Sequence, residues 1–306
     1  MYKLKIPKVN FPMGPFPFPL CFDMTLALLL AYHGLDYRVC FSECYAAEFH
    51  PEKSTLEELL VFPGYDRSKY ERAGIVIEKQ KVTCAQEIAT ILRAQLLQGS
   101  PVMLHFDGYD CPWDKNLFRR QHNEHTVLAT GISRGGKLLK VCDLLFHKHQ
   151  RTVWEKRVMR HCQFYYQIKV PNTLQYDAAR SPRSCLQAFY QTLLRFIDDA
   201  EEHAEILALE KEDTIATKLF SLLQRGRISH HFYSLYLNFL VENGSVEAKE
   251  LYKSMHEAQY VWGDCLFYLL QSNAEHRYCP HEMITCFRAL AECYRKMIAL
   301  PEERTA

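Results

Sequence analysis

Cys21 has the sequence position that a cysteine nucleophile needs. The run CFDMTLALLLAYHG, residues 21–34, spaces its apolar side chains as a helix does and closes with glycine, so Cys21 falls in the first helical turn. A helix N-terminus favours a thiolate through its dipole and its unpaired N–H groups, which can also bind an oxyanion. We therefore predict that Cys21 attacks a carbonyl carbon.

His125 and Asp143 are the residues best placed to serve this thiol. His125 opens the predicted strand HTVLATGI, Asp143 ends the predicted strand KLLKVCD, and Gly135-Gly136 lies between them as a hairpin turn. Antiparallel pairing brings the end of the second strand beside the start of the first. Asp143 then fixes the tautomer of His125, and His125 is the base for Cys21.

Each of these residues also has an ordinary structural interpretation. The chain has 12 cysteines, and any one thiol is more often a buried apolar side chain than a nucleophile. A histidine at a strand end and an aspartate at a turn are likewise common. The three residues together, in order and on suitable elements, favour a catalytic triad.

A zinc site is a second alternative, and its signal is weak. Cys40, Cys44 and His50 form one group and Cys279 with His281 another, but no second close cysteine pair follows at a zinc-finger interval. We therefore predict no metal ion and no cofactor held by the protein itself.

The first half of the chain has the pattern of an α+β domain. Five prolines within residues 1–19 predict an extended path into the helix that begins at Cys21. Capping boxes at residues 54–57 and 83–86 each predict a helix, and the second runs to about residue 98. The segments GIVIEKQ, PVMLHF, HTVLATGI, KLLKVCDLLF and QFYYQIKV read as strands, so we expect the nucleophile helix to pack on an antiparallel sheet.

The second half has the pattern of an all-α domain. Residues 186–209, 214–226, 232–244, 246–272 and 282–300 place apolar side chains at intervals of three and four, with charged side chains between them. The polar stretch PNTLQYDAARSPRS separates the two patterns. We therefore predict a catalytic domain at residues 1–175 and a helical accessory domain at residues 176–306.

Composition excludes several classes of protein. The 37 Lys and Arg against 36 Asp and Glu leave a formal net charge of +1, which gives no field for nucleic acid or an anionic membrane. The N-terminus has no signal-peptide pattern, and the longest apolar stretch, residues 24–32, is too short to span a bilayer. The cysteines are too sparse for a disulfide scaffold. These features favour a soluble cytoplasmic protein.

The segment from residue 96 to 145 closely resembles the N-terminal domain of the butirosin-biosynthesis acyltransferase family, which is papain-like. CFDMTLALLLAYHG, followed by Ser42-Glu43, also resembles the nucleophile helix of that family. The helical half is similar to an accessory domain by pattern alone. The matching features of the segment are Asp107, Tyr109, Pro112-Trp113, His122 with His125, Gly131 and Asp143.

The resemblance implies an acyltransferase of natural-product biosynthesis, such as that of antibiotics. It implies that an acyl, aminoacyl or peptidyl group leaves the phosphopantetheine thioester of a carrier protein, forms acyl-Cys21 and passes to an amine on a small molecule or peptide. Thiol–thioester exchange suits this nucleophile because it is nearly isoenergetic. A hydrolase with the same triad (peptidase, amidase or thioesterase) and a non-catalytic carrier-binding module are the alternatives.

The sequence departs from papain-like peptidases just before Cys21. Those enzymes carry a glutamine there as an oxyanion donor, whereas FPMGPFPFPL contains none. The backbone N–H of Cys21 must then act with another donor. This difference disfavours amide hydrolysis more than thioester chemistry, because amide hydrolysis is the more demanding reaction.

The loop between residues 107 and 122 is predicted to border the cleft, since it joins two strands just before His125. We predict that Asp107 and Asp110 bind a cationic amine and that Tyr109 and Trp113 wall the acyl pocket, with His122 in the same group of substrate-binding residues. The alternative is a packed loop with solvated acids.

The helical half offers one modest basic cluster, made of Lys211, Lys218, Arg225 and Arg227. Carrier proteins are acidic helical bundles, so this cluster suggests a docking face for one. A cluster of charges is more often simply a solvated helix face.

Overall fold

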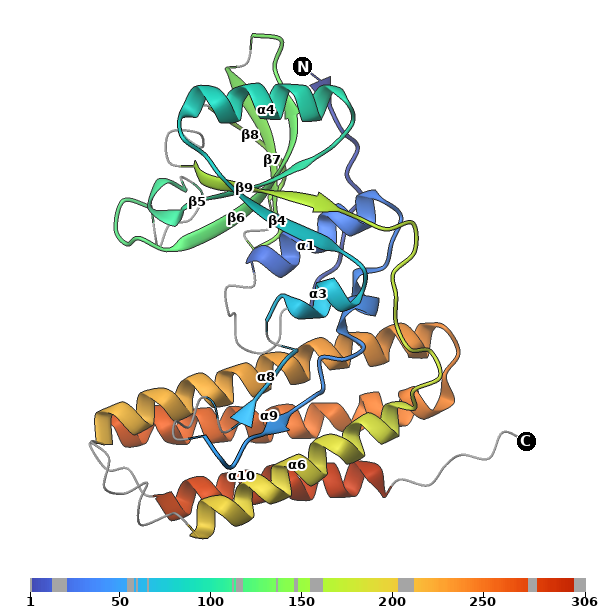
Figure 1. Ribbon diagram of the computed structural model, residues 1–306, viewed down its shortest axis with the longest axis vertical. Helices are drawn as coiled ribbons and strands as arrows, with labels where there is room; N and C mark the ends of the chain where they lie inside the picture. The colour runs from blue at the N-terminus through green and yellow to red at the C-terminus, as the bar shows by residue number, and fades with distance from the viewer. Residues whose placement is uncertain are drawn as a thin grey trace. The chain divides into compact units, whose positions relative to one another are not determined.

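The computed structural model of the protein describes residues 2–12, 21–53, 58, 60–64, 66–111, 113, 118–135, 137–145, 148–154, 162–202, 212–274 and 280–299. The chain divides into two compact units (Figure 1). The first combines Met1–Tyr37 with Gly74–Leu174, and the second combines Arg38–Ala73 with Gln175–Ala306.

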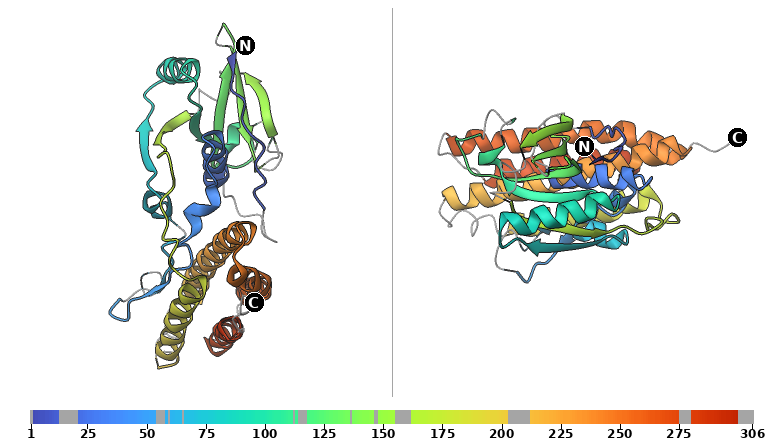
Figure 2. Two further views of the ribbon diagram at one scale, coloured as in Figure 1. Left: turned by 90° about the vertical axis from the view of Figure 1, so that its right-hand side faces the viewer. Right: turned by 90° about the horizontal axis from the view of Figure 1, so that it is seen from above.

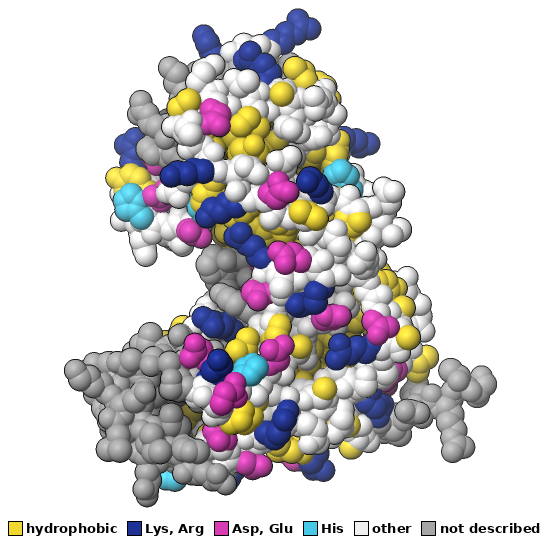
Figure 3. Space-filling view, viewed as in Figure 1, with side chains coloured by type: hydrophobic (Ala, Val, Ile, Leu, Met, Phe, Trp, Pro, Cys, Tyr) yellow, Lys and Arg dark blue, Asp and Glu magenta, His cyan; other side chains and the backbone are white. Residues whose placement is uncertain are grey.

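Acidic and basic side chains intermingle over the face drawn in Figure 3, in keeping with the net charge of +1.

The first unit is built on an antiparallel sheet of seven strands. Six of them follow the order β4-β9-β5-β6-β7-β8, and β1 pairs with β6 outside this path. The strands are β1 (Tyr2–Lys3), β4 (Val76–Lys81), β5 (Val102–Asp107), β6 (Glu124–Ile132), β7 (Leu138–Asp143), β8 (Lys148–Trp154) and β9 (Cys162–Lys169). The fold class is therefore α+β, as predicted.

Two helices pack on this sheet (Figures 1 and 2). Helix α1 (Cys21–Tyr32) contacts β6 and β7, and residues 24–30 are all buried because seven consecutive apolar or small side chains leave no polar face there. Helix α4 (Ala85–Leu97) contacts β5 and β6 and ends before Gly99, whose φ of +84° favours glycine. At its start, Glu87 accepts hydrogen bonds from the backbone and hydroxyl of Thr83, so a helix begins close to the predicted place, but with Glu87 in the role expected of Gln86.

Two strands of this sheet escaped the sequence analysis. β1 lies within the segment predicted to be extended, and its pairing with β6 depends on Gly131, where an added Cβ would lie 2.5 Å from the Tyr2 carbonyl oxygen. β8 pairs with β7 although its sequence KHQRTVW is largely polar. Residues 13–20 and the predicted capping box at 54–57 lie outside the described residues.

The second unit is a helical bundle with a small two-stranded sheet. Its long helices are α6 (Pro182–Glu202), α8 (Glu212–Glu242), α9 (Val246–Ala274) and α10 (Pro280–Ile298). The smaller elements are η1 (Tyr37–Phe41), β2 (Glu48–Phe49), β3 (Leu60–Val61) and α3 (Ser68–Arg72). The four long helices all lie in the half of the chain for which the sequence predicts helices.

Helix α8 is one element where two were predicted. The break was expected near Gly226, but this glycine lies inside the helix because its missing side chain makes room for two rings. A Cβ at Gly226 would lie 2.5 Å from Trp262 and 2.8 Å from Phe62. Close packing, not chain termination, explains this glycine.

The segment Arg38–Ala73 belongs to the helical unit, so the first domain is not the continuous range 1–175. Its aromatic side chains pack among the helices: Phe41 stacks on Phe232 with ring centroids 4.4 Å apart, and Tyr45 lies 4.4 Å from Phe189. Aromatic rings bury a large apolar area, so this segment packs with the helices and does not run over them as a polar linker. The chain returns to the helical unit at Gln175.

The core of the bundle also contains a buried histidine, His230. Its Nε2 lies 2.9 Å from the Met255 carbonyl oxygen, and its Nδ1 faces the hydroxyl groups of Tyr45 and Tyr294 at 3.2 and 3.1 Å. Burial lowers the pKa of His230 to about 3, so the ring is neutral at neutral pH.

Among the described residues, no helix is both long and apolar enough to cross a membrane.

Candidate active site

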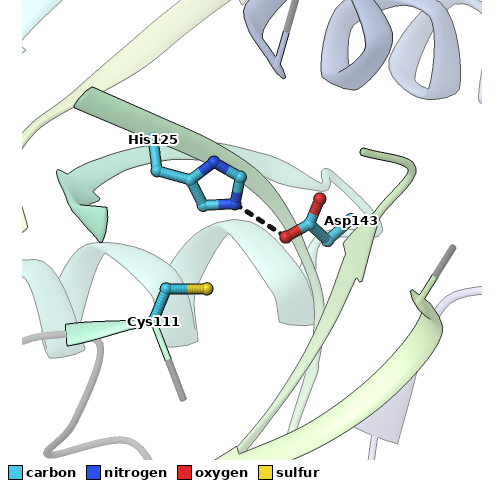
Figure 4. Close-up of side chains that lie close together, drawn as sticks. All are labelled: Cys111, His125 and Asp143. Carbon is cyan, nitrogen blue, oxygen red and sulfur yellow. Dashed lines mark hydrogen bonds and ion pairs between the residues drawn. The ribbon is translucent and has the colours of Figure 1, made fainter. Parts of the chain in front are cut away.

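Strands β6 and β7 bring His125 and Asp143 together. They pair antiparallel with Leu128 opposite Cys142, so the start of β6 lies beside the end of β7, as predicted. Nε2 of His125 lies 2.7 Å from Oδ2 of Asp143 (Figure 4), and the two side chains are only 3% and 1% exposed. Because a carboxylate only accepts, Nε2 carries the proton in this bond.

Helix α1 places Cys21 against the same histidine. The Cys21 thiol is half-buried in the first turn and forms a hydrogen bond with the His125 ring. Since Nε2 is held by Asp143, Nδ1 is the ring nitrogen left to face the thiol. The hydroxyl of Thr25 fixes this turn against β6, because it lies 2.6 Å from the Cys21 carbonyl oxygen and 3.1 Å from that of Thr126.

The surroundings of His125 favour its protonated form. Burial lowers the pKa of the imidazole, but the bonds to Asp143 and Cys21 and the charges of both groups outweigh it and raise this pKa to about 9. An imidazolium at neutral pH is the natural partner of a thiolate. The pair is therefore arranged as a cation beside a nucleophilic sulfur.

Trp113 also contacts the triad. Its indole N–H donates a 2.6 Å hydrogen bond to Oδ2 of Asp143, and its side chain is only 7% exposed. The Arg151 guanidinium lies over the Trp113 ring, 5.5 Å from the centroid. Sequence analysis assigned Trp113 to the wall of an acyl pocket, whereas the structure places its polar edge on the triad carboxylate.

Asp107, Tyr109 and His122 form a cluster of their own. Asp107 accepts from His122 Nδ1 at 2.5 Å and from the Tyr109 backbone at 2.9 Å, and the Tyr109 and His122 rings stack with centroids 4.6 Å apart. Burial raises the pKa of Asp107, but these hydrogen bonds lower it further than burial raises it. The His122 side chain is 75% exposed.

Strand alternation separates Asp107 from His125. Asp107 pairs with Glu124, and Phe106 pairs with His125, so the side chains of Asp107 and His125 leave opposite faces of the β5–β6 pair. The Asp107 side chain accepts a hydrogen bond from the backbone N–H of Tyr109, two residues further on, and so caps its own turn. Aspartate commonly does this in turns, so the sequence could have indicated this structural role. Asp110 ends the short helix η2 (Gly108–Asp110), directly before Cys111.

Sequence analysis missed Cys111, which lies beside the triad (Figure 4). Its sulfur and the side-chain ligand atoms of His125 and Asp143 all lie within 4.8 Å of one another, and all three residues are buried. The set offers sulfur, nitrogen and oxygen ligands, as zinc sites do. However, two ligands on one zinc ion stand about 3.3 Å apart at bond lengths near 2 Å, whereas Nε2 and Oδ2 are 2.7 Å apart. The geometry is that of a hydrogen-bonded pair.

Of the basic cluster predicted for the helical half, the structure describes only the side chains of Arg225 and Arg227, and neither is fully exposed. Arg227 is buried among the helices, and burial lowers its pKa to about 10. Arg225 is half-buried. Lys211 lies outside the described residues, as does the side chain of Lys218. A carrier protein therefore has no described docking face at this cluster.

The geometry supports nucleophilic chemistry at sulfur. A thiol at a helix start, a buried histidine and a buried aspartate form one hydrogen-bonded chain. Such a chain can attack a carbonyl, release a leaving group and accept a proton from a second substrate. No family model matches the chain, and no curated protein matches it.

Proposed function

We propose that the protein is a cysteine-dependent acyltransferase of papain-like type that uses Cys21, His125 and Asp143. One observation carries the proposal: Cys21 at the start of α1 bonds to His125, which Asp143 holds at 2.7 Å. The α+β architecture, with α1 packed on an antiparallel sheet, supports it. The sequence resemblance to the butirosin-biosynthesis acyltransferase family supplies the choice of reaction.

The first half-reaction consumes a thioester. The Cys21 thiolate attacks the thioester carbonyl, and the first-turn N–H groups of α1 stabilise the oxyanion. The carbon–sulfur bond of the donor breaks, and the departing thiolate takes the proton of the His125 imidazolium. Acyl-Cys21, a free thiol and a neutral imidazole result.

The second half-reaction restores the enzyme. An amine attacks acyl-Cys21, the bond to the Cys21 sulfur breaks, and an amide leaves. His125 accepts the proton that the amine loses, so the thiolate and imidazolium return together. Asp143 keeps the imidazole in the required tautomer throughout.

The proposed donor is an acyl, aminoacyl or peptidyl group on the phosphopantetheine of a carrier protein. Thioester exchange makes the weaker demand on oxyanion stabilisation, which fits a chain without the glutamine of papain-like peptidases before Cys21. The proposed acceptor is an amine on a small molecule or peptide.

The experiment incubates the protein with acyl-loaded carrier protein, with and without primary amines, and measures amide and free acid by mass spectrometry. Amide that forms only with the amine and only with intact Cys21 supports acyl transfer. Free acid formed equally well without amine would mean a hydrolase with the same triad. Loss of activity on addition of a chelator would instead indicate a metal held by Cys111, His125 and Asp143.

A further inference from the structure

One oxygen of the triad carboxylate has two donors. Oδ2 of Asp143 lies 2.7 Å from Nε2 of His125 and 2.6 Å from the indole nitrogen of Trp113. Both distances are those of strong hydrogen bonds to a charged acceptor. The two donors come from different elements, because His125 belongs to β6 and Trp113 lies beyond η2.

The double contact restricts the carboxylate. A carboxylate with one donor can rotate about its Cβ–Cγ bond, whereas a second donor on the same oxygen fixes which oxygen faces the histidine. An indole N–H is a donor that never titrates, so this restraint persists at every working pH. Because Trp113 is buried, water has little access to Oδ2 of Asp143 and does not replace the indole N–H there.

We propose that Trp113 is a positioning residue for the triad, whose indole N–H holds Asp143 so that Oδ2 faces Nε2 of His125. This inference rests on the proposed function, because it assigns Trp113 to the support of the same nucleophile. The groups that act on His125 are Cys21 from α1, Asp143 from β7 and Cys111 beyond η2. Arg151 from β8 acts through the ring of Trp113.

The test follows the alkylation of Cys21 by iodoacetamide from pH 5 to 10, with peptide mapping to separate it from other thiols. Cys84 is an exposed thiol and provides an internal reference. We expect Trp113→Phe to raise the pH at which Cys21 alkylation becomes rapid by about one pH unit, because a loosened carboxylate holds the imidazolium less well and the imidazolium then stabilises the thiolate less. The Cys84 profile should not move.

Two further variants isolate the N–H group. Replacement of Trp113 by β-(3-benzothienyl)alanine keeps the bicyclic shape and substitutes sulfur for N–H. It should raise the pH of rapid Cys21 alkylation as Trp113→Phe does, even if the phenylalanine variant folds poorly. Arg151→Gln removes the cation over the ring but keeps the N–H, so it should cause no upward shift.

The outcomes are distinct. A pH of rapid Cys21 alkylation that stays in place or falls in the benzothienyl variant overturns the role of Trp113, as does an upward shift in Arg151→Gln of the same size. If wild-type Cys21 reacts no faster than Cys84 at neutral pH, the proposed function fails instead, since the thiolate itself is then missing.

Discussion

His125 and Asp143 meet through Nε2 and Oδ2 at 2.7 Å in a site where both side chains are almost fully buried. The buried Asp143 carboxylate stabilises the imidazolium form of His125, and its removal takes that stabilisation away. The pair therefore sets the charge that the Cys21 thiol experiences. It also uses Nε2 of His125, which leaves Nδ1 as the ring nitrogen available for proton transfer.

Asp143→Asn should raise the pH at which Cys21 reacts rapidly with iodoacetamide. The asparagine can still accept from Nε2, but its charge is gone, so burial dominates and the pKa of His125 falls well below its present value of about 9. We expect Cys21 alkylation at pH 8 to slow by roughly tenfold or more, which corresponds to a shift of at least one pH unit. The measurement is the iodoacetamide rate at Cys21 as a function of pH.

Glu124→Gln is a matched control for this change, because it also removes one carboxylate from β6 or β7 but at an exposed position. Its profile should match wild type. Equal effects of the two substitutions would show that general charge, and not the bond to His125, governs Cys21.

Thr25→Val should loosen the first turn of α1 without changing the shape of the side chain. The hydroxyl lies within bonding distance of the carbonyl oxygens of Cys21 and Thr126, so its loss should cost about 1 kcal/mol of unfolding free energy. We also expect slower Cys21 alkylation. Urea denaturation and the alkylation rate measure both effects, and Thr25→Ser, which keeps the hydroxyl, should restore most of each.

Gly226→Ala should destabilise the protein although alanine is the better helix former. Helix propensity favours the change by about 1 kcal/mol, but the new Cβ would lie 2.5 Å from Trp262 and 2.8 Å from Phe62. Overpacking of a core costs about 1–3 kcal/mol, so the net effect should be a lower melting temperature. A Gly226→Ala variant more stable than wild type would show that the rings of Trp262 and Phe62 move aside without a loss of packing energy.

His230 should make the protein less stable in acid. Its folded pKa is about 3, below the ordinary value of 6.5, so the unfolded chain binds a proton between these values that the folded chain does not. His230 causes no such loss of stability above pH 6.5. Below that pH, the free energy of unfolding falls as the pH drops toward 3, by up to about 1.4 kcal/mol per pH unit.

The measurement for His230 is the free energy of unfolding at pH 7, 6, 5 and 4, compared with His230→Gln, which keeps a donor and an acceptor but does not titrate. The variant should show a shallower loss on acidification. Equal slopes for the two proteins would contradict the burial of a neutral His230.

The elements that carry Cys21, His125 and Asp143 were predictable because they depend on local rules, whereas the approach of Cys21 to His125 depends on the packing of α1 on β6. A helix start at Cys21 and a hairpin that joins His125 to Asp143 follow from apolar periodicity and strand pairing. The environment of Asp143 was not predictable in the same way. Trp113 and Cys111 reach it from a loop, and no periodicity fixes where loop side chains point.

The sequence analysis also located the helical unit but not its full extent. Phe41 and Tyr45 are aromatic, so their burial was predictable, but the partner that buries them depends on long-range packing. For Gly226, a local rule pointed to a helix end, while a tertiary contact with Trp262 required the same residue inside a helix. Tertiary packing overrode the local preference.

The most direct test of the central claim is intact-protein mass spectrometry of wild type and Cys21→Ala after incubation with short acyl-pantetheine thioesters. We predict one acyl adduct on wild type, sensitive to hydroxylamine and discharged faster by an added amine than by water, and no such adduct on Cys21→Ala. An equal adduct on both proteins, or none on wild type even with acyl-loaded carrier protein, would contradict Cys21 as the acyl-accepting nucleophile.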